Sequence, residues 1–279
     1  MKTIGFVDYY LDEWHANNYP DWIRQLNRGY EVAYAWGEID SPKGGLTTDA
    51  WCEKYGVTRC RTIEELCGKA DFILILSPDN PENHLRYAKA VFPCRKPCYI
   101  DKTFALDRAT AEAIFAEAEK YGVPTFSSSA LRFAAELRDI TEPVQSVSVN
   151  GWGAFDIYTI HFTEIAVRLL GSEVDSVMVT NHTKNVTAAL LYRDGRTASL
   201  NMFEVEGAPG FSVSVEWKKN KPGTYLNLSR DFFMNLLSAV LDMFDGKGVP
   251  VKKEETIAVI ALIEAIRRAR ETPFTLVKV

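Results

Sequence analysis

The sequence predicts an α/β protein: a doubly wound parallel sheet over residues 1–125, then an α+β domain with an open, mostly antiparallel sheet over residues 126–279. In the first stretch, strand-like apolar runs alternate with helix-like amphipathic runs. In the second stretch, several strand-like runs follow one another behind a single helix. Residues 72–105 contain strand, helix and strand in close succession, as in a βαβ unit with parallel strands.

The first domain is expected to alternate between strands and helices. The predicted strands cover residues 3–7, 30–36, 72–77, 98–100 and 123–129. The predicted helices cover residues 20–28, 47–56, 62–70, 81–92 and 107–122. A threonine and Gly56 bound the second of these helices, and Asp107 and Gly122 bound the last, because Thr and Asp cap helix starts and glycine ends helices.

The second domain is expected to be rich in strands. The predicted strands cover residues 144–152, 175–183, 186–204 and 211–229, with hairpin turns at 193–196 and 220–223. The predicted helices cover residues 158–171, 231–246 and 254–271. These helices are too few to cover both faces of a sheet, so we expect a homo-oligomer in which a partner subunit covers the other face.

Composition limits the classes of partner. A formal net charge of −5 and the lack of a long basic run argue against nucleic acid. No apolar run approaches the roughly 20 residues that cross a bilayer, and the N-terminus does not resemble a signal peptide, so we expect a cytoplasmic protein without a membrane partner. The five cysteines lack metal-ligand spacing and are expected to be reduced packing residues, with no metal site.

A single cation follows a buried strand of the first domain. Lys102 comes directly after the short strand 98–100, and the turn SPDNPENH begins at Ser77, where the strand before it ends. Parallel strands of a βαβ unit deliver their carboxyl ends to the same edge of the sheet. We therefore expect Lys102 and this turn to share one site.

Four motifs in this order resemble the glucose-fructose oxidoreductase and inositol dehydrogenase family, called Gfo/Idh/MocA, over nearly the whole chain. SPDNPENH, with His84, is similar to the family's Thr-Pro-Asn turn with its following His. KPCYIDKTFA resembles the strand that ends in Glu-Lys-Pro, with Asp101 for Glu and Thr103 for Pro. ALRF at 130–133 and the helix DIYTIHFTEIAVRLLG at 156–171 resemble the family's Arg-Phe pair and its helix with Asp, His and Leu-Gly.

The resemblance implies a Rossmann-like nucleotide-binding domain that holds a nicotinamide cofactor, and a sugar or polyol between the domains. It implies that Lys102 contacts the reacting hydroxyl, and that His161 takes its proton as hydride leaves for the cofactor. The residues expected at the cofactor are Asp8, Tyr9, Trp36, Glu38, Ser77, Pro78, Asp79, His84 and Asp101. The residues expected at the substrate are Ser129, Arg132, Tyr158 and Glu164.

The turn after the first strand departs from the family. A dinucleotide fold uses glycines there to bring backbone amides against the diphosphate, but no glycine stands between Gly5 and Gly29. Asp8, Asp12 and Glu13 occupy this stretch instead. Such acids favour the start of a helix, and the same charges would repel a diphosphate.

Two further departures concern the ribose and the catalytic acid. Trp36 ends the second strand where an acid usually holds the ribose; Glu38 lies just beyond, and the absence of a basic residue there favours NAD over NADP. Asp156 lies five residues before His161, whereas the family's acid lies four before. Asp156 therefore serves either the site or the N-cap of the helix, and Tyr158 is an alternative source of a hydroxyl.

Two functions remain open from the sequence. Lys102 and His161 favour an NAD(P)-dependent dehydrogenase that acts on a CH–OH group of a sugar, polyol or related metabolite. The missing glycines favour a catalytically silent relative that binds a sugar-like ligand or a protein and has lost the dinucleotide. A cofactor without a diphosphate is a third possibility.

Overall fold

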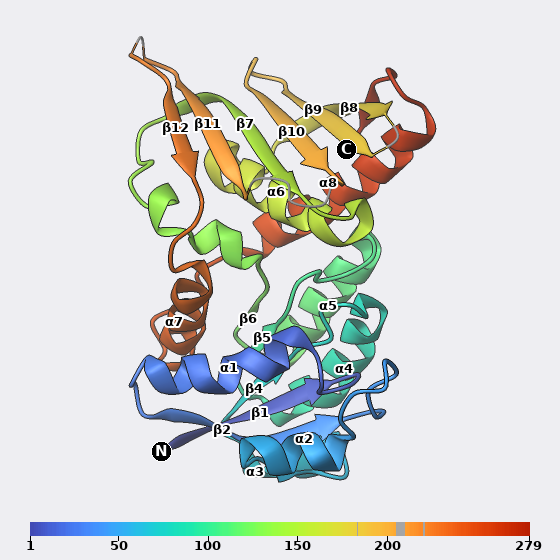
Figure 1. Cartoon of the computed structure of the whole chain (residues 1–279), viewed down its shortest axis with the longest axis vertical. Coiled ribbons are helices and arrows are strands. Elements are labelled where there is room, and N and C mark those ends of the chain that lie inside the picture. Colours follow the sequence, from blue (N-terminus) through green and yellow to red (C-terminus); the bar gives the residue numbers. More distant parts are fainter. Residues whose placement is uncertain (183, 205–209, 220) are drawn as a thin grey trace. The chain divides into compact units, whose positions relative to one another are not determined.

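The chain folds as two compact units (Figure 1). The computed structural model describes residues 1–182, 184–204, 210–219 and 221–279; Asn220, in the predicted turn 220–223, lies outside them. One unit comprises Met1–Ser127 and Leu237–Lys252, and the other comprises Ser128–Leu236 and Lys253–Val279. Within the described part of the chain, no helix combines the length and apolar character needed to cross a membrane.

A parallel sheet forms the centre of the first unit. Among the described residues its strand order is β3-β2-β1-β4-β5-β6, and every neighbouring pair is parallel. The strands are β1 (Lys2–Asp8), β2 (Tyr30–Gly37), β3 (Thr58–Arg59), β4 (Phe72–Ile75), β5 (Cys98–Ile100) and β6 (Thr125–Phe126). The order reverses between β1 and β4, which is the position where open α/β sheets bind ligands. The predicted doubly wound sheet is confirmed.

Helices flank this sheet on both faces, with α1 on one side of β1 and α3 on the other (Figure 1). The helices are α1 (Trp14–Gln25), α2 (Thr48–Tyr55), α3 (Ile63–Lys69), α4 (His84–Val91) and α5 (Arg108–Tyr121), with 3-10 turns at Pro81–Asn83 and Phe92–Cys94. Gly5 lets α3 approach β1, since a Cβ at Gly5 would lie 2.6 Å from the Leu66 side chain. Asp107 caps α5 by accepting from the Thr110 amide at 2.7 Å, as predicted.

A mixed sheet forms the centre of the second unit. In the described residues its order is β12-β11-β7-β10-β9-β8-β13; β10 and β7 are parallel, and the other pairs are antiparallel. The strands are β7 (Val144–Trp152), β8 (Val174–His182), β9 (Asn185–Tyr192), β10 (Thr197–Phe203), β11 (Ser212–Trp217), β12 (Thr224–Asn227) and β13 (Val277–Lys278). The predicted open, mostly antiparallel sheet is confirmed.

Long helices cover one face of this second sheet. They are α6 (Phe155–Leu170) and α8 (Lys253–Glu271), and short 3-10 turns lie at Ala130–Phe133 and Ala135–Leu137. Val149 and Leu200 face the helices and are fully buried, whereas Ser148 and Asn201 on the opposite face are only half-buried. Strand alternation therefore leaves a polar face on the side away from α6 and α8.

The helix α7 (Phe232–Phe244) begins in the second unit and ends in the first. Sequence alone places its whole length in the second domain, but its last turn is held by residues of the first unit. Asp242 pairs with Arg28 at 2.8 Å, and Phe244 stacks on Phe72 with ring centroids 4.5 Å apart.

Candidate functional site

Asp101 and Lys102 directly follow β5 and are buried. Asp101 is fully buried and Lys102 is 9% exposed. The Asp101 carboxylate pairs with His15 Nδ1 and accepts from the Tyr99 hydroxyl at 3.2 Å and from the Lys102 amide at 2.8 Å. Burial acts to raise the pKa of Asp101, but His15 and then Lys102 outweigh it and hold that pKa below its usual value. Asp101 is therefore a buried carboxylate that fixes His15.

His15 joins α1 to this strand end. Its ring stacks on Tyr19 with centroids 5.2 Å apart and planes 7° apart. Tyr19 is fully buried, and within the described residues its hydroxyl has no hydrogen-bond partner. This arrangement gives His15 a structural role, because the pair is packed between helix and sheet.

Glu13 caps α1 with its side chain. The residue has an extended backbone, with φ −129° and ψ 170°, and is 8% exposed. Its carboxylate accepts from the amide of His15 at 2.7 Å and also from the amide of Ala16. Its carbonyl accepts from the amide of Asn17 at 2.9 Å. Three successive amides at the start of α1 are thus bonded to Glu13.

Asp8 ends β1 beside the turn that follows β4. Its Oδ1 accepts from the Ser77 amide at 3.0 Å and from the Ser77 hydroxyl at 3.1 Å. Ser77 Oγ in turn accepts from the Tyr9 amide at 2.9 Å. Asp8 is 1% exposed, and its Oδ2 has no hydrogen-bond partner within the described residues. The predicted residues Asp8, Tyr9 and Ser77 therefore come together, bonded to one another.

Two buried acids at this edge hold protons unusually well. Burial raises the pKa of Asp8 to about 8, with a smaller contribution from the charge of Asp101. Burial, followed by the charge of Asp8, raises the pKa of Glu13 to about 8. These two groups interact, so their titrations are linked and the apparent pKa values belong to the pair.

Glu38, which we expect to bind the cofactor ribose, is bonded to two residues of α4. Its carboxylate pairs with the Arg86 guanidinium at 2.6 and 3.1 Å and accepts from the Tyr87 hydroxyl. The Arg86 hydrogen bond is the main cause that lowers the pKa of Glu38. Trp36 lies edge-on to Tyr87, with ring centroids 5.6 Å apart. Both residues are thus tied to α4.

His84, Pro78 and Asp79 belong to the turn after β4. His84 is fully buried, and its ring nitrogens lie 3.0 Å from the Phe104 carbonyl and 2.6 Å from the Leu76 carbonyl. Pro78 is buried, and Asp79 is exposed and pairs with Lys43 at 3.6 Å. The contacts of His84 make it a structural link between α4 and the strand ends.

Ser129 and His161 meet in the second unit. Ser129 Oγ lies 2.6 Å from His161 Nδ1 and accepts from the Leu131 amide at 3.2 Å. The Tyr158 ring is edge-on to His161 at 5.2 Å. Gly153, at φ +134°, gives Tyr158 its place, because a Cβ there would overlap the Tyr158 ring. Three of the predicted residues therefore form one group, with Tyr158 and His161 on α6 and Ser129 at the start of the 3-10 turn Ala130–Phe133.

Arg132 and Glu164 form a buried ion pair beside this group. Arg132 Nη1 lies 3.1 Å from Glu164 Oε2, and Arg132 also pairs with Glu255. Glu164 Oε1 accepts from the Ser129 amide at 3.3 Å. Burial is the main cause that raises the pKa of Glu164, while Arg132 opposes it. The pair holds Ser129, and through it His161, in place.

Asp156 does not cap α6. The N-cap residue is Ala154, which makes no side-chain cap, and Asp156 is exposed in the first turn. The helix also begins three residues earlier than the predicted start at 158, so Asp156 lies inside it. The N-cap alternative for Asp156 is wrong for that reason.

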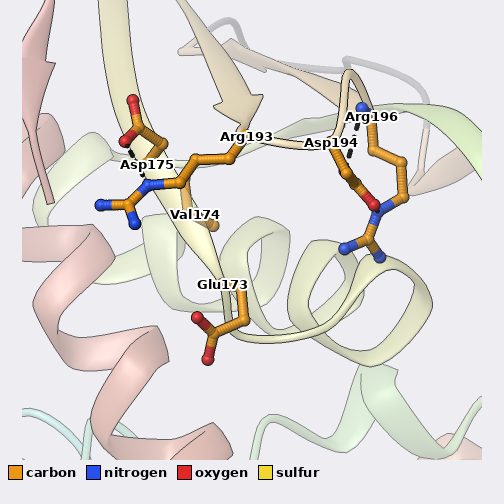
Figure 2. A pocket seen from close by; sticks show the side chains of 6 residues that line it. All are labelled: Glu173, Val174, Asp175, Arg193, Asp194 and Arg196. Carbon is orange, nitrogen blue, oxygen red and sulfur yellow. Dashed lines mark hydrogen bonds and ion pairs between the residues drawn. The ribbon is translucent and has the colours of Figure 1, made fainter.

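One surface cavity of the second unit is lined mainly by charged side chains (Figure 2). It is lined by Glu173 and Val174 together with two paired arginines. Arg193 pairs with Asp175 at 2.9 Å, and Arg196 with Asp194 at 2.7 Å. Since the arginines already have carboxylate partners, this cavity offers no specific site for an anion.

The comparisons with known proteins support the fold. No family model and no curated protein matches the chain. An oxidoreductase from Agrobacterium radiobacter, solved with NAD+, L-tartaric acid and magnesium, is 14% identical, with a TM-score of 0.79 over 99% of this chain and 98% of that one. A putative myo-inositol dehydrogenase from Sinorhizobium meliloti is 15% identical, with a TM-score of 0.77 over 100% and 99%.

A third solved structure extends this likeness to a nucleotide-sugar enzyme. UDP-N-acetylglucosamine 3-dehydrogenase from Acidithiobacillus ferrooxidans is 15% identical, with a TM-score of 0.77 over 96% of this chain and 97% of that one. The chain therefore has the two-part fold of these oxidoreductases along its whole length. At this level of identity the likeness describes the fold, and the chemistry has to come from the residues.

The residues of the first unit do not fit the diphosphate of a dinucleotide. That group needs unoccupied amides at the start of the first helix and room beside them. Here Glu13 takes the amides, and the buried Asp8, with its unpartnered oxygen, lies at the end of β1.

Sequence reasoning offered helix capping for the acids Asp8, Asp12 and Glu13 as a group without singling out Glu13, and it missed the pairing of His15 with Asp101. Glutamate is not among the preferred N-caps, so only its position before Trp14 hinted at capping. The contact of His15 with Asp101 joins positions 86 residues apart, and no local pattern signals it.

Proposed function

We propose that this chain is a small-molecule-binding protein of the oxidoreductase fold, and that its ligand is a neutral polyhydroxylated compound of the sugar or polyol class. The observation that carries this proposal is a cavity of about 250 Å³ in the second unit, at the ends of β7, β10, β11 and β12. We call it the strand-end pocket. Its volume lies below the range of about 300–1,000 Å³ typical of drug-sized ligands and suits a single ring.

Aromatic rings supply the apolar part of the strand-end pocket. Phe203, Phe211 and Tyr225 line it. The Phe211 ring sits over Gly151, where a Cβ would lie 2.5 Å from the ring, and is edge-on to His161 at 5.7 Å. Such rings match the carbon-bound hydrogens on the face of a sugar ring.

Two amide groups supply hydrogen-bond donors. The Asn150 Oδ1 accepts from Asn201 Nδ2 at 2.9 Å, and the Asn227 Oδ1 accepts from the Tyr225 hydroxyl at 2.9 Å. These bonds fix which way each amide points. In the described part of the chain, the Nδ2 groups of Asn150 and Asn227 have no hydrogen-bond partner, so both are available to hydroxyl oxygens of a ligand.

The pocket contains no charge among its described lining residues, which are Asn, Gly, Phe, Ser, Tyr and Leu. A charged ligand would lose its hydration there without gaining an ion pair, whereas a neutral polyol would exchange water for the two amides. This contrast favours neutral polyols over sugar phosphates and carboxylates.

Binding of myo-inositol and D-glucose, measured by saturation-transfer NMR and calorimetry, tests this proposal. We expect binding by the full-length protein and a loss of at least about tenfold in affinity for Asn227→Ala, the effect of about 1.4 kcal/mol for one hydrogen bond. Asn185→Ala is the matched control, because Asn185 is an exposed asparagine on β9, outside the pocket. Equal loss in both variants, or no binding of any neutral polyol, would refute the proposal.

A second candidate function is an NAD-dependent dehydrogenase that acts on a CH–OH group of such a ligand. The observation that favours it is the buried Lys102 at the end of β5, beside the ionised Asp101. It requires Glu13 to leave the start of α1. Turnover of polyols with NAD+, followed at the NADH absorbance, tests it: Lys102→Ala should abolish any such turnover, and NAD+-dependent turnover that survives this change would remove Lys102 from the reaction.

We also propose that the chain forms a homo-oligomer through the polar face of its second sheet. In support, α6 and α8 cover only the opposite face, and Trp152 on β7 is 42% exposed. Light scattering on the purified protein tests this, and a monomeric mass at micromolar concentration would contradict it.

A further inference from the structure

We infer that Glu13 is a built-in occupant of the place where this fold holds a diphosphate, and that the first unit is a scaffold that works without a dinucleotide. Dinucleotide folds offer the diphosphate the backbone amides of the first turn of their first helix. In this chain the amides of His15, Ala16 and Asn17 are all bonded to Glu13. The side-chain oxygens of Glu13 accept from the His15 and Ala16 amides, as phosphate oxygens would, and its carbonyl accepts from the Asn17 amide.

Two amides of the loop before α1 also have acceptors within the protein. The Tyr9 amide donates to Ser77 Oγ at 2.9 Å, and the Glu13 amide donates to the Leu11 carbonyl at 2.8 Å. Tyr10 and Leu11, which stand where a dinucleotide turn needs glycine, are 5% and 1% exposed. Their side chains therefore fill the space that a glycine-rich turn would leave for the phosphates.

Occupancy, rather than charge, excludes the ligand. Burial raises the pKa of Asp8 and of Glu13, which favours the protonated form of each group. Each proton that they hold weakens the repulsion of a diphosphate. It would still have to displace a side chain that is 8% exposed and bonded to two amides.

The test is to empty this position and ask whether an anion enters. Glycine at the N-cap costs a helix only a few tenths of a kcal/mol, so Glu13→Gly frees two amides while keeping α1. Asp8→Asn keeps the acceptor for Ser77 and removes the second acid. The matched control is Asp107→Gly, which changes the N-cap of α5 in the same unit.

Calorimetry with sodium pyrophosphate gives the readout at pH 7. We expect no saturable binding by the wild-type protein or by Asp107→Gly. We expect saturable binding by Asp8→Asn/Glu13→Gly, with an affinity for pyrophosphate at least tenfold above the detection limit that bounds the wild type. If the double variant shows no cooperative unfolding transition, and is therefore not folded, the single variant Glu13→Gly is used in its place. The inference is overturned if the wild type or Asp107→Gly binds as tightly as the emptied variant, or if a folded emptied variant still fails to bind.

Discussion

Replacing the buried Asp8 should change how the stability of the protein depends on pH. Asp8→Asn keeps the size of the side chain and its two bonds to Ser77 but cannot ionise. The pKa of Asp8 is raised from 3.8 to about 8 in the folded chain. The folded state therefore binds one more proton than the unfolded state at pH values between these two, and its stability falls as pH rises through this range.

The magnitude follows from that one proton. Each proton of difference changes the free energy of unfolding by about 1.4 kcal/mol per pH unit. The wild type should therefore lose at least about 1.4 kcal/mol per pH unit relative to Asp8→Asn between pH 5 and pH 7. Because the charge of Asp8 also raises the pKa of Glu13, the variant should flatten the contribution of Glu13 as well.

Urea unfolding followed by tryptophan fluorescence at pH 5, 6 and 7 measures this difference. Buried His84 is present in both proteins, so its titration cancels in the comparison. Asp71→Asn is the control: bonds from Thr3 lower the pKa of Asp71, so it is ionised throughout this range. If the stability curves of wild type and Asp8→Asn run parallel, the burial argument is wrong.

Three further substitutions test the second unit. Gly153→Ala should destabilise the protein by about 2 kcal/mol or more in thermal unfolding, because alanine is strained at φ +134° and its Cβ overlaps Tyr158; an unchanged melting temperature would contradict this. Ser129→Ala should shift the ¹⁵N signals of the His161 ring, since Ser129 Oγ lies against its Nδ1, while Ser127→Ala should not; identical spectra would exclude a positioning role. Asp156→Asn should change the free energy of unfolding by less than about 0.5 kcal/mol, because Asp156 is exposed; a loss of about 1 kcal/mol would indicate the capping role that the structure excludes.

Local sequence patterns predict most of the helices and strands, because caps, glycine helix ends and apolar spacing depend on neighbouring residues only. Asp107 is predicted as the N-cap because aspartate accepts bonds from the first helical amides. Gly122 is predicted as the helix end because glycine readily adopts a positive φ, here +67°. The strand at 144–152 follows from its valines interspersed with polar residues, and its bounds match the prediction.

Local sequence patterns do not predict contacts between segments that are far apart in the chain. The end of α7 folds with the first unit because Asp242 and Asp245 meet Arg28 and Lys2, and no property of the helix alone shows this. The short β13 pairs with β8 across a separation of about a hundred residues, at Val277 and Val177. Phe211 reaches His161 in the same way.

In the candidate site too, the sequence predicts local features but not the contacts between side chains. The missing glycines were visible in the sequence and indicated an abnormal phosphate site. Two readings of the acids stayed open, helix capping and repulsion of an anion, since both depend on where the side chains point. The bonds from the His15 and Ala16 amides to Glu13 support capping, and because of this capping the two amides are not available to a diphosphate.

Titration of the wild-type protein with NADH tests the central claim most directly. Trp14 adjoins Glu13, and Trp36 lies near the end of β2 at the same edge of the sheet, so a dinucleotide bound there would quench tryptophan fluorescence. With Glu13 on the amides of α1, fluorescence corrected for absorption should show no saturable change up to millimolar NADH. Saturable quenching with one NADH per chain would contradict the account.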